Sequence, residues 1–359
     1  MTQTILPRTM TRRGFTLTAL LGTTAALALR SAPALAQGKG QIVLANWGGD
    51  ATDAYAEAYG KPYEAATGIA LKQDGAGPTE GAIAAQAESG KPGWDLVDVD
   101  PFSAETLGKK GMIVPIDYTV VDKSKVREGY TWTHSVGTYM FSYVLVYDKR
   151  KFGDNPPKTM ADFFDTAKFP GKRTMYKWGT GMWEAALMAD GVPQDQLYPL
   201  DIERAHKKIA ALKPEIVAFW GNGSESQQLM LDGEAVMGLL FSTRARLIER
   251  DTDGDVTFTW NQGMISPGAL AVLKGAPGGE AEAMKFIAFT QEPERQKVMF
   301  DMLSQAPANP ATDALIPAEE RRYNAMDPEN GANQRPLDMA WYEANYTAAL
   351  DAYLKLVSG

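Results

Sequence analysis

Short apolar runs alternate with amphipathic stretches from residue 41 onward. The run QIVLANWGG (41–49) is apolar and ends in Gly-Gly, and the spacing of residues 53–68 predicts an amphipathic helix that ends at Gly68. The same order of strand and helix recurs at 68–73 with 78–90, and at 94–100 with 103–111. Such alternation favours a mainly parallel sheet covered by helices, so we expect an α/β fold.

Two long apolar runs interrupt this alternation. Residues 138–147 (TYMFSYVLVY) are rich in β-branched and aromatic side chains, and a second run covers 264–272. Between them lies another α/β segment. Its predicted helices are 159–167, 181–191, 201–213 and 225–234, and its predicted strands lie near 172–177 and 234–242. Residues 280–303 are strongly helical, and 338–357 predict a terminal amphipathic helix.

This order is better explained by two lobes with two extended crossings than by two sequential domains. We expect residues 37–141 and 265–312 to form lobe 1 and residues 142–264 to form lobe 2. Residues 313–359 are expected to form a C-terminal helical segment that packs on the lobes, on lobe 2 in particular. Even without its first 36 residues the chain exceeds the roughly 250–300 residues at which one core usually stops growing.

The first 36 residues are typical of an export signal of the twin-arginine kind. Arg12 and Arg13 precede an apolar stretch, and Ala34 and Ala36 give the A-x-A spacing of a cleavage site. A membrane anchor is the alternative, but threonines interrupt the stretch, which is shorter than the ~20 apolar residues of a spanning helix. We therefore expect cleavage after Ala36 and a periplasmic protein.

Cysteine is absent from the chain, which excludes lipid attachment at a cleavage-site cysteine, disulfides and thiolate metal sites. The chain has 36 basic and 44 acidic residues, and four of the arginines lie in the predicted signal. The remaining chain is therefore strongly acidic. Nucleic acids and anionic membrane surfaces are not expected as partners.

Four segments, in this order, resemble the periplasmic solute-binding proteins of ABC importers, in the branch that includes the spermidine/putrescine-binding proteins. They are LANWGG (44–49), WDLVDVDPFSAETLGKKGMIVPID (94–117), LMLDGEAVMGLLFS (229–242) and GALAVLKGAPGGEAEAMKFIAFTQEPERQ (268–296). The resemblance covers nearly the whole chain after the signal. It implies a two-lobed type II fold with two crossover strands as the hinge. It also implies a monomer without cofactor or metal, which closes on a small ligand and then meets a membrane permease.

In open α/β sheets, ligands bind beyond the carboxyl ends of the strands. Together with the resemblance, this rule selects a set of candidate ligand-binding residues. They are Trp47, Asp50, Asp100, Phe102, Trp178, Trp183, Phe241, Arg244 and Ser266. Trp47 stands where the family typically has an aromatic side chain against the ligand, and the alternative for it is a tryptophan that packs between the lobes.

The chain departs from the polyamine binders at the positions that hold amines. Their W-x-D on the return strand reads Ser266-Pro267-Gly268 here, and Trp178 and Gly181 align with acids that those proteins use. A tryptophan of lobe 2 has become Phe241. Because a buried di-cation would lose most of its counter-charges, spermidine or putrescine is the alternative ligand rather than the expected one.

Two arginines follow the predicted strand at 234–242. With Ser242 or Thr243 as N-cap, Arg244 and Arg246 fall in the first turn of a helix, where the helix dipole is already positive. For Arg246 we expect a local ion pair with Glu249. For Arg244 either a ligand carboxylate or a salt bridge between the lobes is expected.

An acid that faces Arg244 would suit a zwitterionic ligand with an amine at one end and an acid at the other. We expect Asp50 or Asp100 in this role, with aromatic side chains along the aliphatic middle of the ligand. The candidates for this flanking role are Trp47, Trp178, Trp183 and Phe241.

Three other functions remain as alternatives. The first alternative is an enzyme. The chain has only two histidines, His134 and His206, and His206 is expected on a solvated helix face, which does not favour histidine-based catalysis. A pair of carboxylates that cleaves sugars remains possible within this alternative. A ferric-iron binder typically uses adjacent tyrosines, and the chain has no Tyr-Tyr pair. A receptor that docks on a sensor would share the same fold and site.

Overall fold

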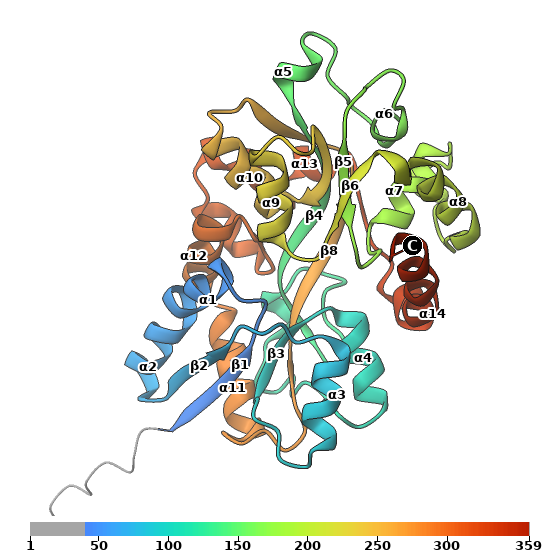
Figure 1. Ribbon diagram of the computed structural model, residues 1–359. Coiled ribbons are helices and arrows are strands. Elements are labelled where there is room, and N and C mark those ends of the chain that lie inside the picture. Colours follow the sequence, from blue (N-terminus) through green and yellow to red (C-terminus); the bar gives the residue numbers. More distant parts are fainter. Residues whose placement is uncertain (1–39, 359) are drawn as a thin grey trace, which may run out of the picture. The chain divides into compact units, whose positions relative to one another are not determined.

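Ten strands form one hydrogen-bonded sheet in the computed structural model, which describes residues 40–358 (Figure 1). Along the sheet the order is β2-β1-β3-β8-β4-β7-β5-β6, and β10 pairs with β8 while β9 pairs with β4. The strands are β1 (Gln41–Ala45), β2 (Ala70–Asp74), β3 (Leu96–Val99), β4 (Val136–Asp148), β5 (Arg173–Tyr176), β6 (Ile216–Trp220), β7 (Met237–Phe241), β8 (Val256–Val272), β9 (Ala306–Pro307) and β10 (Gln334–Pro336). The predicted twin-arginine signal lies outside the described residues.

Two parallel groups of strands flank the long pair β4 and β8. β2, β1 and β3 are parallel to one another, as are β7, β5 and β6. β8 runs antiparallel to β3 and to β4, and β4 runs antiparallel to β7. β4 and β8 therefore connect the two groups, and they contain the predicted crossings at 138–147 and 264–272.

The pairing partners change partway along both long strands. β4 residues 143–147 pair with β7, whereas β8 residues 269–272 pair with β3. The register between β4 and β8 shifts after Tyr143, so their pairing divides into 264–270 and 256–259 on β8. The change of partners lies close to the expected lobe boundaries, which themselves stay a prediction.

Helices cover both strand groups. They are α1 (Asp50–Tyr55), α2 (Lys61–Thr67), α3 (Glu80–Glu88), α4 (Pro101–Lys109), α5 (Lys149–Phe152), α6 (Met160–Phe164), α7 (Met182–Ala189), α8 (Ile202–Leu212), α9 (Gly223–Leu231), α10 (Ser242–Asp251), α11 (Glu280–Thr290), α12 (Pro293–Leu303), α13 (Pro328–Gly331) and α14 (Met339–Ser358). A π-turn, η1 (Ala56–Gly60), joins α1 to α2, and short 3₁₀ turns follow at η2 (Lys123–Lys125), η3 (Gln194–Gln196), η4 (Lys213–Glu215), η5 (Pro310–Leu315) and η6 (Ala318–Tyr323). Gly68 ends α2 in the left-handed conformation, as the sequence predicts.

Two expectations on secondary structure are wrong. The continuous helix expected at 280–303 is two helices, because Pro293 has no backbone N–H to continue the first helix and instead begins α12. Strand β6 was not predicted, and it forms the edge of the sheet beside β5. As an edge strand it has Val217 exposed.

Separate apolar cores lie under the two strand groups. Around β1 and β3, the core includes Tyr55, Tyr59 and Phe286. Around β5 and β7, the core includes Trp183 and Trp220 and also takes side chains from α14. The terminal helix thus contributes to the second core, and it also contacts α4 of the first strand group.

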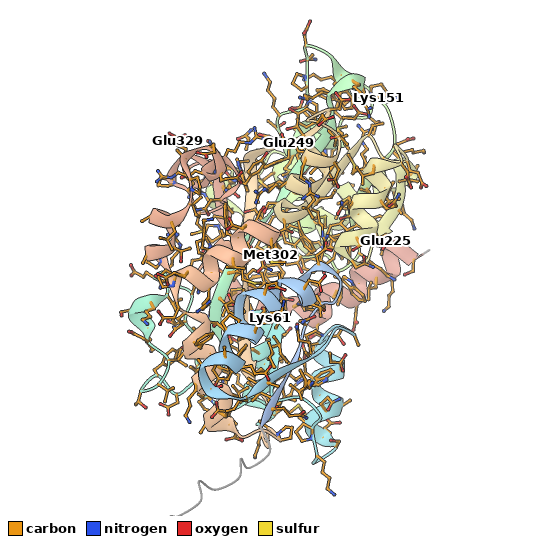
Figure 2. All side chains as sticks on the ribbon, turned by 90° about the vertical axis from the view of Figure 1, so that its left-hand side faces the viewer. Lys61, Lys151, Glu225, Glu249, Met302 and Glu329 are labelled. Carbon is orange, nitrogen blue, oxygen red and sulfur yellow. The ribbon has the colours of Figure 1, made fainter. Side chains whose placement is uncertain are left out.

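Charged side chains point outward on the face of the molecule shown in Figure 2, for example those of Lys61, Lys151 and Glu225. Met302 on α12 is an apolar side chain that is exposed there. Among residues 40–358, no helix combines the length and the apolar character that a membrane span requires.

Candidate functional site

Asp100 stands directly after β3, at the N-cap position of α4. Its side chain does not cap the helix, and within residues 40–358 its carboxylate has no hydrogen bond or ion pair. Burial raises the pKa of this carboxyl group to about 6. Because a partly buried carboxylate without a partner is costly, Asp100 is a strong candidate for binding a cation.

A cluster of aromatic rings lies at the carboxyl ends of β5, β6 and β7, where these strands meet β4. We call it the aromatic cluster; it consists of Phe141, Tyr143, Tyr176, Trp220 and Phe241. The Phe141 and Phe241 ring centroids are 5.0 Å apart, and those of Tyr143 and Phe241 are 5.3 Å apart. Tyr176 packs on Trp220 at 4.3 Å. The cluster offers ring faces to an aliphatic or cationic group.

The Asp100 carboxylate is electrostatically coupled to several phenol groups. Burial raises the pKa values of Tyr143 and Tyr176, and the negative charge of Asp100 adds to both shifts. The same holds for Tyr139 on β4 and for Tyr346 on α14. Asp100 from the first strand group therefore lies near phenols of the second group and of the terminal helix.

Asp98, two residues earlier on β3, is held by tyrosines. The Tyr139 hydroxyl donates to its two carboxylate oxygens at 3.0 and 3.2 Å, and Tyr55 also hydrogen-bonds to it. Burial raises the pKa of Asp98 to about 7, against the lowering effect of these hydrogen bonds. Asp98 is thus a partnered carboxyl group, unlike Asp100.

Tyr139 also explains the glycine at the end of Ser266-Pro267-Gly268 on the return strand. The two strands pair Tyr139 with Gly268, and a Cβ atom on Gly268 would lie 2.0 Å from Cζ of the Tyr139 ring. The ring therefore fills the space that a side chain at this position would need. This difference from the W-x-D of the polyamine binders follows from packing on β4.

Arg244 forms the salt bridge that the sequence offered as one of two possibilities. Its Nη1 atom lies 2.6 Å from Oδ2 of Asp50, and Gln227 Oε1 lies 3.4 Å from the same nitrogen. Gly223 lies close to this side chain, since a Cβ atom there would be 2.6 Å from Arg244 Nε. The side chain of Arg244 is only 14% exposed, whereas that of Asp50 is 59% exposed. The ion pair joins α10 to α1.

The predicted N-cap of α10 is wrong. Phe241 occupies the N-cap position, and Ser242 is the first helical residue, since the backbone turns into the helix one residue earlier than expected. The buried Ser242 hydroxyl instead accepts a hydrogen bond from the backbone N–H of Ser142 at 3.1 Å. It ties the start of α10 to β4.

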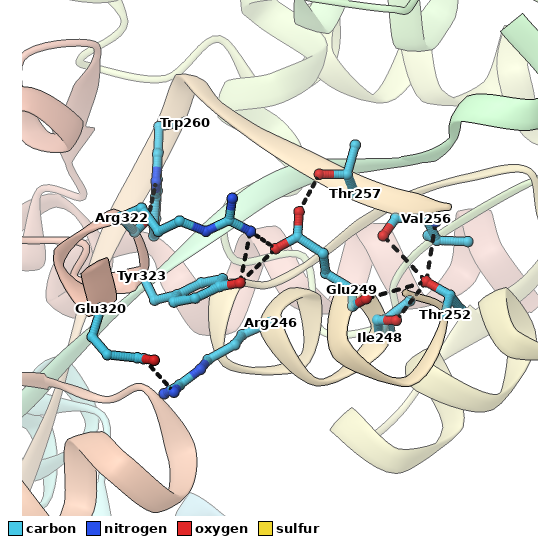
Figure 3. A network of polar contacts seen from close by, with 10 residues as sticks. All are labelled: Arg246, Ile248, Glu249, Thr252, Val256, Thr257, Trp260, Glu320, Arg322 and Tyr323. Carbon is cyan, nitrogen blue, oxygen red and sulfur yellow. Dashed lines mark hydrogen bonds and ion pairs between the residues drawn. The ribbon is translucent and has the colours of Figure 1, made fainter. Parts of the chain in front are cut away.

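The predicted ion pair between Arg246 and Glu249 is also wrong. Arg246 donates to Ser304 Oγ at 2.8 Å. It also pairs with Glu320 (Figure 3). Glu249 pairs with Arg322 and accepts from the hydroxyls of Tyr323 at 2.8 Å and Thr257 at 2.6 Å (Figure 3). Tertiary partners with several charge-assisted hydrogen bonds replace the weaker local pair.

Three of the predicted site residues are buried in packing. Trp183 is fully buried in the second core, where its Nε1 atom donates to His206 Nε2 at 3.1 Å. Burial lowers the pKa of His206, which therefore does not lie on a solvated face as expected. Phe102 packs between rings of α14, and Ser266 is buried beside β4.

The other predicted residues are more accessible. Trp47 is 47% exposed in the loop after β1 and lies against Gly77. Trp178 is half-buried, and its Nε1 atom donates to the Gly221 carbonyl at 3.1 Å. Of the predicted set, Phe241 contributes to the aromatic cluster near Asp100, and Asp50 meets Arg244. The ligand-contacting role of each residue stays a prediction.

Sequence reasoning missed four phenols whose pKa values the charge of Asp100 raises: Tyr139, Tyr143, Tyr176 and Tyr346. Tyr139 and Tyr143 lie in the aromatic run at 138–147, which was interpreted only as a crossing. Tyr346 is far from the strand ends in sequence, so no local pattern indicates that α14 returns to this place.

Two surface hollows lie elsewhere. One is lined by side chains of α2 and α11 such as Tyr63 and Phe289, and the other lies along β6 near Lys213. Neither contains Asp100 or Arg244. Within residues 40–358, no three His, Asp or Glu side chains are grouped so that they could hold a metal ion.

Asp98 and Asp100 predict a pH-dependent stability. Their pKa values, about 7 and about 6, lie above the value near 3.9 of an unfolded aspartate. The folded state therefore binds more protons, and its stability should fall as the pH rises from about 4 to about 7. We expect the wild type to lose about 1–3 kcal/mol over this range relative to the double variant Asp98→Asn/Asp100→Asn, measured by urea unfolding. A difference that does not change with pH would contradict the raised pKa values.

Comparison with known proteins places these observations in a family. A profile of bacterial extracellular solute-binding proteins matches residues 58–326. The gamma-aminobutyric acid-binding protein of Pseudomonas aeruginosa is 32% identical over 319 residues, which are 86% of this chain and 89% of that protein. The spermidine/putrescine-binding periplasmic protein of Salmonella typhimurium is 23% identical over 254 residues, 66% of this chain and 69% of that protein.

Solved structures of solute-binding proteins are also similar to this chain. An ABC transporter substrate-binding protein from Bradyrhizobium japonicum superposes with a TM-score of 0.83 at 33% identity and covers 88% of this chain and 99% of its own. A GABA receptor superposes with a TM-score of 0.82 at 33% identity and covers 89% of this chain and 98% of its own. Both are type II periplasmic binding proteins.

Proposed function

Because the chain belongs to the bacterial extracellular solute-binding protein family, we propose that its ligand is a small zwitterion of the ω-amino acid type. The chain has the two-lobed type II fold, with β4 and β8 as crossover strands, which confirms the predicted fold class. It is the substrate-binding component of an ABC transporter for a small organic solute, and it is not an enzyme. The family implies export to the periplasm.

The unpaired carboxylate of Asp100 is the observation that carries the ligand proposal. It has no cation among residues 40–358, and the phenols and rings around it can pack against an aliphatic ammonium. A ligand ammonium supplies the missing counter-charge. Phe241 and Tyr143 then lie along its methylene groups.

We assign the acidic end of the ligand to Arg244. This guanidinium is mostly buried and is held in place by Gln227 and by the close approach of Gly223. Its partner Asp50 is mostly exposed, so a ligand carboxylate can share or replace that contact at a modest cost. The start of α10, whose first N–H groups receive no side-chain cap, adds positive potential there.

A polyamine is the second candidate, since the chain resembles spermidine/putrescine-binding proteins as well. A diamine needs a counter-charge at each end. Asp98 already accepts from tyrosines and Asp50 already pairs with Arg244, so of these three acids Asp100 is the one without a partner in residues 40–358. The P. aeruginosa relative, named for gamma-aminobutyric acid, also supports the zwitterion.

Export, partners and lobe boundaries of the protein are also proposed. We propose that Arg12 and Arg13 direct twin-arginine export and that the signal is cleaved after Ala36. The acidic chain then acts as a free monomer in the periplasm, does not bind nucleic acid, and delivers its solute to the permease. Lobe 1 comprises 37–141 and 265–312, and lobe 2 comprises 142–264.

Isothermal titration of the exported protein tests this function. We expect γ-aminobutyrate to bind at micromolar concentration or better and to raise the melting temperature, because it binds only the folded state. Putrescine and spermidine should bind at least ~100-fold more weakly. Tighter binding of putrescine than of γ-aminobutyrate would reverse the order of the two candidates.

A matched pair of arginine variants tests the assignment of the acidic end. Arg244→Ala should abolish the ligand-dependent rise in melting temperature, because it removes the proposed carboxylate contact. Arg246→Ala should lower the melting temperature of the free protein, since its bonds to Ser304 and Glu320 are lost, but should leave most of the ligand-dependent rise. Differential scanning fluorimetry with and without γ-aminobutyrate measures both. Equal effects of the two variants would refute the assignment.

A further inference from the structure

The C-terminal helix α14 contacts α4, which covers the first strand group, and α8, which covers the second (Figure 1). Phe102 of α4, which follows β3, packs against Tyr342 and Tyr346 of α14 with ring centroids 5.3 and 4.7 Å apart. Toward the second group, the Tyr353 hydroxyl donates to the backbone carbonyl of Tyr176 at 2.9 Å. The helix therefore lies alongside the place where the two groups meet, next to Asp100.

Tyr346 is the residue of α14 that reaches this place. Its hydroxyl donates to the Trp178 carbonyl at 3.2 Å, and its ring touches Phe102, which is two residues from Asp100. The negative charge of Asp100 acts on its phenol, and the Thr180 side chain hydrogen-bonds to it. The Tyr346 oxygen therefore lies beside the residues that follow β5, within the electrostatic reach of the unpaired Asp100 carboxylate.

The chemistry of this oxygen distinguishes between kinds of amine. A phenol that donates its one hydrogen to a carbonyl keeps lone pairs with which it can accept. A primary ammonium has three N–H donors, of which Asp100 alone cannot satisfy all, so a second acceptor is required when the group is buried. A trimethylammonium group has no N–H donor and gains nothing from a phenol oxygen.

We propose that α14 forms part of the ligand site and that Tyr346, accepting a hydrogen bond from the ligand, selects primary ammonium groups over quaternary ones. This inference rests on the proposed function, in which Asp100 receives the ammonium. Phe102 is then a positioning residue rather than the ligand contact that the sequence predicted. It holds the Tyr346 ring in place from the side of lobe 1.

The support of Tyr342 makes this arrangement rigid. The Tyr342 hydroxyl donates to the buried Glu184 at 2.8 Å and accepts from the Gly181 N–H at 3.2 Å. Tyr198 donates to the same Glu184 oxygen at 2.6 Å. The Tyr342 ring, on which Phe102 stacks, is therefore fixed to α7. A movement of the lobes that displaces Phe102 would also change the contact between Phe102 and Tyr346.

Titration of two ligands on three forms of the protein tests the proposal. The ligands are γ-aminobutyrate and its N,N,N-trimethyl analogue, and the proteins are the wild type, Tyr346→Phe and Tyr353→Phe. We expect Tyr346→Phe to weaken γ-aminobutyrate about 10-fold and to leave the trimethyl analogue within about 2-fold, because only the primary amine loses an acceptor. Tyr353→Phe removes a phenol from the same helix that donates to a backbone carbonyl and is not proposed to accept from the ligand, so it should not change the ratio of the two affinities.

Phe102 provides a second measurement. Phe102→Leu should lower the preference for the primary amine as Tyr346→Phe does, and Phe102→Tyr, which keeps the ring, should retain it. Tyr346→Met, verified as folded by circular dichroism, replaces Tyr346→Phe if that variant does not fold. A merely structural role of the two residues would weaken both ligands by the same factor.

The outcomes separate the inference from the function on which it rests. If the wild type binds γ-aminobutyrate and Tyr346→Phe leaves the ratio of affinities unchanged, the role of Tyr346 is refuted while the proposed function stands. If the wild type binds neither ligand, the proposed function itself is refuted, and the inference with it.

Discussion

Asp100→Asn is expected to weaken γ-aminobutyrate binding by ~100-fold or more. Removing one member of a buried charge pair typically costs ~2–5 kcal/mol, and ~2.7 kcal/mol corresponds to 100-fold. The effect should be large because the Asp100 carboxylate is partly buried and has no hydrogen bond or ion pair in residues 40–358, so the ligand ammonium would supply its counter-charge. Isothermal titration at pH 8, well above its pKa of about 6, measures the loss with the wild-type carboxylate fully ionised.

Asp154→Asn is the matched control for this experiment. Asp154 lies exposed in the turn after α5, so the substitution changes the net charge by the same amount without altering Asp100, Arg244 or Asp50. Its affinity for γ-aminobutyrate should equal that of the wild type. If Asp100→Asn also binds like the wild type, the ammonium must bind elsewhere and the proposed orientation of the ligand is incorrect.

Trp183→Ala is expected to lower the free energy of unfolding by about 3–5 kcal/mol, as is typical when a large buried ring is removed. The Trp183 ring is fully buried and packs against Tyr353 with centroids 5.8 Å apart. Its loss also leaves His206 without the donor that it accepts from. Urea unfolding of wild type and variant measures the difference.

Trp47→Ala serves as the control, because Trp47 is half exposed and its removal leaves no cavity. Its effect on stability should stay within about 0.5 kcal/mol. The milder variant Trp183→Phe, which remains folded more readily, should bind γ-aminobutyrate with wild-type affinity. If Trp183→Phe is stable but no longer binds the ligand, Trp183 takes part in ligand binding, as the sequence predicted.

The fold class could be predicted because it depends on local patterns. The alternation of short apolar runs with amphipathic stretches specifies strands and helices one after another, and short connections make a parallel sheet the simplest arrangement. The long runs at 138–147 and 264–272 exceed what one lobe needs, and they are β4 and β8, the strands shared by both groups. The broken helix at Pro293 could have been predicted from the same rules.

The candidate site was only partly predictable. Asp100 follows a buried strand directly, so its place at the sheet edge was evident from the sequence. Trp183 was assigned to the site because it also follows a strand, yet the turn of α7 directs its ring into the core. The local ion pair expected between Arg246 and Glu249 does not form, because Arg246 pairs with Glu320 and Glu249 pairs with Arg322.

The sequence by itself determined most of the strands and helices and the carboxylate that stands at the end of β3, because these depend on neighbours within a few positions. It also supplied the acidic balance and the absence of cysteine. Only the tertiary structure decided that Tyr346 of the last helix lies near Asp100 and that Arg244 meets Asp50, since these contacts join residues about 200 positions or more apart. Whether a polar side chain is paired or left free is determined by what the fold brings against it, and that information is not local.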